Sequence, residues 1–246
     1  MNREDKGGEE EEEIVCLDES FFINDDYQLT TFTFGSQVLQ LFCLQSASTD
    51  FDLTGQLVWP GAMLMNDYIS KNAELLQGSS IIELGSGVGI TGILCSRFCR
   101  EVVLTDHNDE VLKARLGVEK LEWGNSDQIN QILHKYSGGF DLILGADIYI
   151  RCPRLLFIFQ YESNGSRCIS FQQSSIPPLF DTVEQFFRIR DTGQCKFILA
   201  YVSRAKMMDA MVISEATCHG MLINEIAGTR SAVGNLEGVI FQVTLQ

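Results

Sequence analysis

The sequence lacks the features that mark membrane, secreted and zinc-binding proteins. No apolar run approaches the roughly 20 residues of a membrane-spanning helix, and the N-terminus is acidic where a signal peptide is basic. The eight cysteines form no Cys-x-x-Cys pair, and Cys95 and Cys99 have no nearby histidine to complete a zinc site. We therefore expect buried free thiols, no metal, and a location in the cytoplasm or nucleus.

Basic side chains are also scarce, with 18 Lys and Arg against 33 Asp and Glu and a net charge of −15. Residues 1–14 contribute −5 of this charge, and the low-complexity acidic segment 1–13 is expected to be a disordered tail. The remaining chain still carries −10, which repels phosphates and argues against nucleic-acid binding. Such a surface would attract cationic partners, including a lysine-bearing protein, although many acidic proteins are simply soluble.

The most informative stretch is residues 81–92, which reads Ile-Ile-Glu-Leu-Gly-Ser-Gly-Val-Gly-Ile-Thr-Gly. Its pattern predicts a buried parallel strand that turns tightly into a helix. Gly85, Gly87 and Gly89 allow positive φ angles and a close approach of the backbone to a ligand. The start of the helix offers unpaired N–H groups to a polar ligand.

Two cofactors are compatible with these glycines. Gly87-x-Gly89-x-x-Gly92 satisfies the dinucleotide rule, with Asp106 as the following acid. In the other register, Glu83 ends the strand, where its carboxylate would repel a pyrophosphate but accept hydrogen bonds from an ammonium group. S-adenosylmethionine carries an ammonium and a sulfonium and no phosphate. We favour it over a nicotinamide cofactor, and a structural turn without a ligand is the least favoured interpretation.

The rest of the chain alternates between strand and helix patterns, after a predicted hairpin at 28–34 and 38–44. Strands are predicted at 80–85, 101–106, 116–121, 140–147, 196–201, 221–227 and 238–245. Helices are predicted at 63–76, 90–99, 127–136, 179–190 and 204–218. The predicted fold is α/β, a Rossmann-like doubly wound, mostly parallel seven-strand sheet with a C-terminal antiparallel strand and an N-terminal β-hairpin extension.

Several candidate binding residues lie at predicted strand ends, where ligands bind in open α/β sheets. Asp106 can take both hydroxyls of a ribose, and His107 beside it is interpreted as an exposed loop residue next to the ligand. Trp123 could stack on an adenine or be ordinary packing, and Trp59 could cover a ligand or anchor a helix to the core. Asp147 is the candidate for a substrate-facing group.

Five motifs in order resemble the lysine methyltransferase-like group called methyltransferase family 16. They are Val58-Trp-Pro-Gly61, Glu83-Leu-Gly-Ser-Gly-Val-Gly89, Leu104-Thr-Asp-His-Asn108, Leu121-Glu-Trp-Gly124 and Asp141-Leu-Ile-Leu-Gly-Ala-Asp147. The resemblance implies a class I methyltransferase domain over 55–246, preceded by a β extension at 14–54. It spans residues 57–147 most clearly.

The resemblance also implies roles for individual residues. Glu83 and the loop formed by Gly85, Ser86, Gly87 and Gly89 would hold the methionine part of S-adenosylmethionine. Asp106 would bind the ribose, with His107 beside it, Trp123 would flank the adenine, and Trp59 would lie close to the cofactor. Asp147 matches the acid of the Asp-x-x-Tyr signature, which faces the target amine and orients it as the catalytic residue.

The function implied is S-adenosylmethionine-dependent N-methylation, with a lysine side chain of a protein as the favoured acceptor and no nucleic-acid or membrane partner. One alternative is a small-molecule acceptor. A second is an inactive methyltransferase-like module that acts through protein contacts, and the weakest is a nicotinamide-dependent oxidoreductase.

The chain departs from the family pattern in two places. Only residues 107–117 separate the second and third strands, and position 150 is Ile where an aromatic is expected, with Tyr149 one place early. Removing an irregular segment at 149–169 would give Asp147-Ile-Ser-Phe171, which restores the aromatic. We hypothesise a variant isoform with one segment shortened and one inserted. A sibling transcript without the insert would support this hypothesis, and its absence from all transcripts of the gene would contradict it.

Overall fold

The computed structural model describes residues 27–45, 55–114, 117–147, 175–189 and 195–246 of the chain. The predicted acidic tail at 1–13 and the predicted insertion at 149–169 lie outside the described residues. The same holds for segments 14–26 and 46–54 of the predicted extension.

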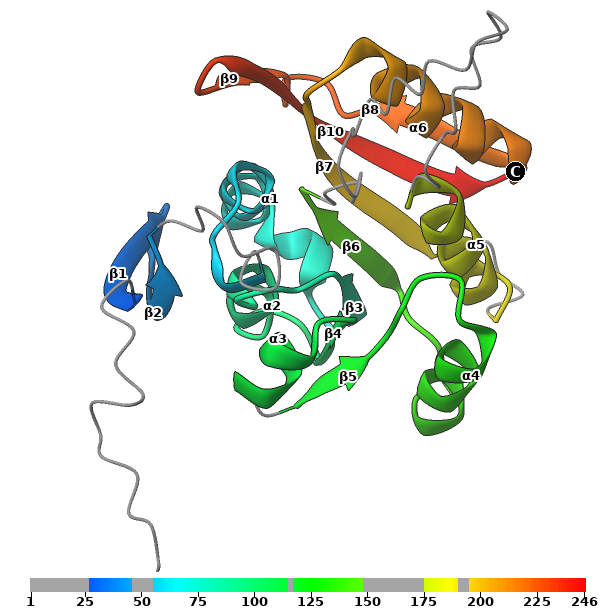
Figure 1. Ribbon diagram of the computed structural model, residues 1–246, viewed down its shortest axis with the longest axis horizontal. Helices are drawn as coiled ribbons and strands as arrows, with labels where there is room; N and C mark the ends of the chain where they lie inside the picture. The colour runs from blue at the N-terminus through cyan, green and yellow to red at the C-terminus, as the bar shows by residue number, and fades with distance from the viewer. Residues whose placement is uncertain (1–26, 46–54, 115–116, 148–174, 190–194) are drawn as a thin grey trace, which may run out of the picture.

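A central sheet organises the described part of the chain (Figure 1). Its strands are β3 (Ser80–Leu84), β4 (Glu101–Asp106), β5 (Val118–Lys120), β6 (Leu142–Ala146), β7 (Lys196–Ser203), β8 (Met221–Glu225), β9 (Ser231–Val233) and β10 (Leu236–Leu245). The strand order is β5-β4-β3-β6-β7-β10-β8, with β9 paired to β10. Strands β5 to β7 pair in parallel along this order, and β10 runs antiparallel to β7, β8 and β9. The predicted sheet is confirmed.

Helices cover both faces of this sheet (Figure 1). They are α1 (Pro60–Lys71), α2 (Ile90–Cys95), α3 (Asp109–Ala114), α4 (Ser126–Lys135), α5 (Ile176–Phe187) and α6 (Lys206–Cys218), with a 3-10 turn η3 (Ala73–Leu76) after α1. One apolar core joins α4, α5 and α6 to the sheet, and a second joins α1 and α2 to its other face. The two cores explain the doubly wound pattern of the sequence.

Strand β3 shows how the sequence builds this layering. All five of its residues are buried, as expected for a central strand with both faces covered. Ile82 and Leu84 pack in the core under α4, α5 and α6, whereas Ile81 packs in the core under α1 and α2. Burying a side chain of this size stabilises the fold by about 1.5–3 kcal/mol. Strand β3 therefore fixes the start of the loop that follows it.

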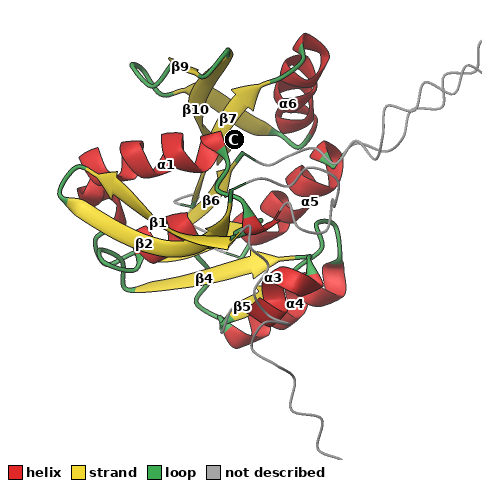
Figure 2. Ribbon diagram, turned by 60° about the vertical axis from the view of Figure 1, so that its left-hand side comes forward, coloured by secondary structure: helices red, strands yellow, loops and turns green. Residues whose placement is uncertain are grey.

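The N-terminal hairpin is a separate two-stranded sheet of β1 (Tyr27–Phe34) and β2 (Gln37–Leu44) (Figure 2). The strands pair from Tyr27 opposite Leu44 to Phe34 opposite Gln37, which confirms the predicted hairpin. Phe34, Leu39 and Cys43 enter the core shared with α1 and α2. The hairpin is therefore attached to the α1 side of the main domain.

The structure corrects several predicted boundaries. Helix α1 begins at Pro60 and ends at Lys71, where the pattern predicts 63–76. Helix α5 begins at Ile176, so its first turn contains the two prolines that were predicted to precede it. Proline is tolerated in a first helical turn because its missing N–H has no partner there. Strand β9 was not predicted, since three residues carry too little pattern. Helix α3 has only six residues, which agrees with the shortened segment after β4.

The described residues also bear on the predictions for membrane helices, metal ligands and cysteines. Among the described residues, no helix is long and apolar enough to cross a membrane, and no group of three or more His, Cys, Asp or Glu is placed to hold a metal. Cys43, Cys95 and Cys195 are buried free thiols, as predicted. The prediction is wrong for Cys99, which is only half-buried, and for Cys218, which is exposed near the end of α6.

His219, which follows α6, makes the pairing of α6 and α5 dependent on pH. Burial lowers the pKa of His219, but the hydrogen bonds to Asp181 and to the Glu215 backbone, together with the charges of Asp181 and Glu184, outweigh burial and leave the pKa above its ordinary value. The Nε2–Oδ1 distance is 2.9 Å. Because the folded-state pKa is raised, the stabilisation is fully present below the unfolded pKa of about 6.5 and is lost as pH rises through the folded-state pKa.

We therefore expect Asp181→Asn to destabilise the protein more at pH 6 than at pH 8.5, by less than about 1 kcal/mol because Asp181 is half exposed. Urea unfolding of both proteins at the two pH values measures this difference. An equal effect of the substitution at both values would show that the ion pair contributes nothing to stability.

Candidate cofactor and acceptor site

The glycine loop between β3 and α2 has the predicted backbone. Gly85, Gly87 and Gly89 have φ angles of 66°, 50° and 71°. At Gly87, a Cβ atom would lie 2.9 Å from the carbonyl oxygen of Gly55, so only glycine fits without moving backbone. The hydroxyl of Ser86 is buried in this loop and has no hydrogen-bond partner within the described residues. The loop therefore keeps a buried polar group for which a ligand could provide the partner.

Asp106 ends β4 and holds the loop from the side. One carboxylate oxygen accepts the Gly87 N–H at 2.9 Å, and the other accepts the Asn108 N–H at 2.9 Å. Only 5% of Asp106 is exposed, whereas half of the His107 side chain is exposed, with Nδ1 3.5 Å from Asp106. Each carboxylate oxygen retains a second lone pair. The predicted ribose contact is therefore compatible with these bonds.

Trp123 lies over the same loop from the segment after β5. An aromatic carbon of Trp123 is 3.3 Å from the position that a Cβ of Gly85 would occupy. The adjoining Gly124 N–H donates to Thr182 Oγ1 on α5 at 2.8 Å, which fixes the segment. The structure thus brings Asp106 and Trp123 to the loop that contains Gly85, although Gly85 and Trp123 are 38 positions apart in the chain.

Glu83 is turned toward α2. Its carboxylate accepts the Gly92 N–H at 2.8 Å, and only 3% of the residue is exposed. The negative charge also reaches Cys95, whose thiol pKa is raised first by burial and then by Glu83. Glu83 therefore braces the start of α2 beneath the loop, and its contact with an ammonium group stays a prediction.

Asp147 lies one residue beyond β6, with a φ of 48° that is uncommon outside glycine. Its side chain is fully buried and engaged on both oxygens. Arg204 donates to Oδ1 at 2.6 Å and to Oδ2 at 2.9 Å, and the Gly61 N–H donates to Oδ2 at 3.0 Å. The Arg204 guanidinium is 5.8 Å from the Trp59 ring centroid. Trp59 and Asp147 are therefore joined through an arginine.

Sequence reasoning missed Arg204 and Gly61. Arg204 directly follows β7, the strand beside β6, and a charged residue at that edge of a parallel sheet was the available signal. Gly61 contributes a backbone N–H and a close approach, because a Cβ there would lie 2.5 Å from the Asp147 Cβ. No side-chain pattern could indicate such a contact.

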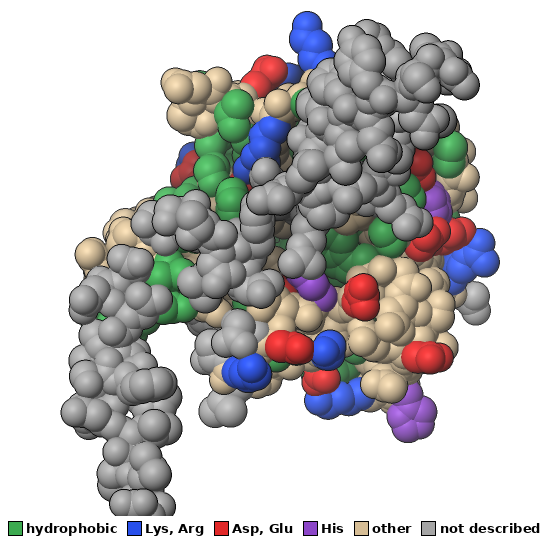
Figure 3. Space-filling view, viewed as in Figure 1, with side chains coloured by type: hydrophobic (Ala, Val, Ile, Leu, Met, Phe, Trp, Pro, Cys, Tyr) green, Lys and Arg blue, Asp and Glu red, His purple; other side chains and the backbone are tan. Residues whose placement is uncertain are grey.

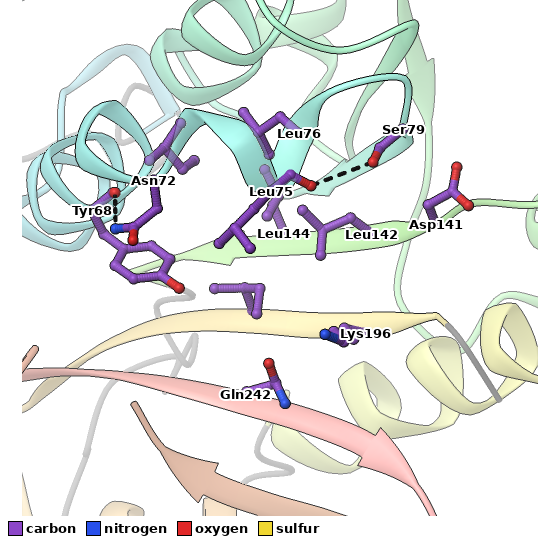
Figure 4. A pocket seen from close by; sticks show the side chains of 12 residues that line it. Tyr68, Asn72, Leu75, Leu76, Ser79, Asp141, Leu142, Leu144, Lys196 and Gln242 are labelled. Carbon is purple, nitrogen blue, oxygen red and sulfur yellow. Dashed lines mark hydrogen bonds between the residues drawn. The ribbon is translucent and has the colours of Figure 1, made fainter. Parts of the chain in front are cut away.

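A separate cavity of about 230 Å³ lies on the α1 side of β6 and β7 (Figure 4). Tyr68, Leu142 and Lys196 are among its lining residues, and none of the predicted site residues lines it. Leu142 and Lys196 are the first residues of their strands, so this cavity reaches the sheet edge opposite the glycine loop. It does not belong to the candidate site.

The strand order differs from that of a dinucleotide-binding sheet. A dinucleotide-binding sheet has the order 3-2-1-4-5-6. Here the same order is interrupted, because the reversed strand β10 lies between β7 and β8. That arrangement, with a glycine loop followed by acids at the ends of β4 and β6, fits the methyltransferase fold that the family resemblance implies.

Comparison with known proteins agrees. The family model described as lysine methyltransferase matches residues 43–153, which are somewhat less than half of the chain. Protein N-lysine methyltransferase METTL21A of Mus musculus is 32% identical over 137 residues, which are 49% of this chain and 57% of that protein. EEF1A lysine methyltransferase 3 of Mus musculus is 35% identical over 103 residues, 37% of this chain and 42% of that protein. The chain thus spans about half the length of these curated relatives.

The solved structures are more distant. Precorrin-6y C5,15-methyltransferase from Geobacter metallireducens GS-15 has 12% identity and a TM-score of 0.45, with 81% of this chain and 93% of that one covered.

Proposed function

We propose that this protein is an S-adenosylmethionine-dependent N-methyltransferase that acts on a lysine side chain of a protein. The observation that carries the proposal is the junction of the glycine loop with Asp106. In it, the acid at the end of β4 bonds directly to the Gly87 N–H of the loop that follows β3. The carboxylate that we expect to bind the ribose thus lies beside a backbone that only glycine can form without moving its neighbours.

The residues present fit the cofactor in three respects. The buried Ser86 hydroxyl has no partner among the described residues, and Asp106 retains unused acceptor capacity. Trp123 offers an aromatic ring beside Gly85 on which a base could stack.

The chemistry requires little acid or base from the protein. S-adenosylmethionine, when bound, supplies a methyl group that its sulfonium already activates. The chain must align an uncharged amine with that methyl group and exclude water. A lysine has a pKa of about 10.4 in water, so the site must favour its neutral form. Such an amine would approach between Asp147, which follows the end of β6, and Trp59, which precedes α1.

A protein acceptor is supported by the names of the relatives and by the surroundings of Trp59. A cavity of about 270 Å³ lies between the hairpin and the segment before α1, and Phe32, Leu57 and Trp59 are among its lining residues. It would accommodate the chain on either side of a target lysine. In the face shown in Figure 3, acidic and basic side chains of the described residues are interspersed. The visible described residues of this face therefore form no single acidic patch.

Calorimetry with S-adenosylmethionine and with NADH tests the cofactor. We expect binding of the first and none of the second. A chain that binds neither would instead be the methyltransferase-like binding module. The acceptor is tested by comparing methyl transfer to a protein extract with transfer to a metabolite pool, and transfer to the metabolites alone would overturn the proposal of a protein substrate.

Asp106→Asn is expected to weaken S-adenosylmethionine binding by about 10-fold to 100-fold, because charge-assisted hydrogen bonds contribute about 1.5–3 kcal/mol each. Asp67→Asn is the matched control, since Asp67 is an exposed acid on α1 that pairs with Lys71. Calorimetry on both variants measures the effect. Equal affinities for the two variants would remove Asp106 from the cofactor site.

A further inference from the structure

The carboxylate of Asp147 is fully neutralised within the chain. None of its side chain is exposed, and its two oxygens accept three hydrogen bonds, two from Arg204 and one from Gly61. The two Arg204 bonds, at 2.6 and 2.9 Å, are the bidentate geometry in which a guanidinium and a carboxylate match best. Asp147 therefore does not present an open negative charge to an incoming side chain.

Arg204 occupies the position where a cation would be recognised. Its guanidinium lies between the Asp147 carboxylate and the face of Trp59, with 29% of the side chain exposed. A carboxylate beside an aromatic ring is a favourable cation site. The protein fills that site with its own arginine.

Two acids on the neighbouring elements have hydrogen-bond or ion-pair partners of their own. Asp209 of α6 accepts the hydroxyls of Tyr201 and Ser203 at 2.8 Å each. Burial, followed by the bond to Asp209, raises the Tyr201 pKa well above its ordinary value, so this tyrosine stays neutral. On β10, Glu237 pairs with Arg230 at 2.7 Å, and the first turn of α1 contains no acid.

These charges matter because only a neutral amine can attack a methyl group. A buried unpaired carboxylate favours the ammonium form of a nearby lysine, and a nearby cation disfavours it. We propose that Arg204 is a specificity-determining residue of the acceptor site, which cancels the charge of Asp147 so that the site selects an uncharged amine over an ammonium ion. This inference builds on the proposed N-methyltransferase function.

The test compares Arg204→Met with the double variant Arg204→Met/Asp147→Asn. The single variant leaves Asp147 unpaired. The acidic limb of the kcat profile, which reports the enzyme–substrate complex, should therefore move to higher pH by about 1 unit or more. The double variant, which is neutral again, should return the limb toward the wild-type position. Arg100→Met is the control, since Arg100 lies 4.0 Å from Asp141 at the opposite sheet edge.

A second readout needs no catalysis. Binding of the cation Nα-acetyl-lysine methylamide, followed by NMR at pH 7, should tighten by about tenfold or more in Arg204→Met relative to wild type. It should return to the wild-type affinity in the double variant.

The results that would overturn the role of Arg204 differ from those that would overturn the proposed function. A limb that stays in place while kcat falls equally at every pH would make Arg204 a structural clamp and overturn the inference. Unchanged affinity for the lysine probe would do the same. If the wild type neither binds S-adenosylmethionine nor transfers methyl groups, the proposed function fails, whereas the probe still decides whether Arg204 excludes cations from this site.

Discussion

Gly87→Arg is expected to abolish S-adenosylmethionine binding, with at least a 100-fold loss of affinity in calorimetry. Gly87 has a φ of 50°, and any side chain would begin 2.9 Å from the carbonyl oxygen of Gly55. Accommodating arginine therefore requires the loop or the segment before α1 to move. Movement of the loop would also break the Gly87–Asp106 hydrogen bond of 2.9 Å. Both consequences remove the geometry on which the cofactor would depend.

Gly228→Arg is the matched control. Gly228 also has a positive φ, 79°, but nothing lies within 4 Å of its Cβ position. The control therefore carries the backbone cost of about 1–2 kcal/mol and the added charge, without a collision at the site. We expect it to bind the cofactor as the wild type does. Equal binding by both variants would mean that the glycine loop does not contact the ligand.

Gly61→Ala is expected to reduce both stability and methyl transfer. The added Cβ would lie 2.5 Å from the Asp147 Cβ and 2.6 Å from the Asp147 backbone nitrogen, where no flexible side chain can give way. Helix α1 and the end of β6 must then move apart. This movement weakens the Gly61–Asp147 hydrogen bond and displaces the carboxylate to which Arg204 is bonded. We expect a loss of about 2–4 kcal/mol in the free energy of unfolding and at least a tenfold fall in kcat/KM.

Gly138→Ala provides the comparison, because Gly138 has open space around its Cβ position and no strained φ. It should be neutral in urea unfolding and in activity. If Gly61→Ala matched it in both measurements, the close contact between α1 and the end of β6 would not exist in solution.

The sequence predicted the framework because its signals are local. The apolar run of β3 followed by three glycines fixes a strand, a turn and a helix within twelve residues. The acids at Asp106 and Asp147 follow buried strands, and parallel pairing brings their ends to one edge. The alternation of elements then indicates the doubly wound sheet.

The charge state of the acceptor site was not predictable in the same way. Arg204 meets Asp147 across 57 positions of the chain, and the meeting depends on β7 pairing with β6. The sequence shows an arginine at the start of a predicted helix, without indicating which carboxylate it neutralises. Likewise, Glu83 was predicted to face an ammonium group, whereas its distance of 2.8 Å to the Gly92 nitrogen emerges only from the packing of α2.

The central claim is the transfer of a methyl group to lysine, and isotope labelling tests it most directly. The purified full chain is incubated with trideuteromethyl S-adenosylmethionine and a protein extract, followed by peptide mass spectrometry. Gly87→Arg serves as the inactive control. We predict trideuteromethyl groups on lysine Nε atoms of one or a few proteins with the wild type and none with the variant. Label confined to small molecules, or equal labelling by both proteins, would contradict the account.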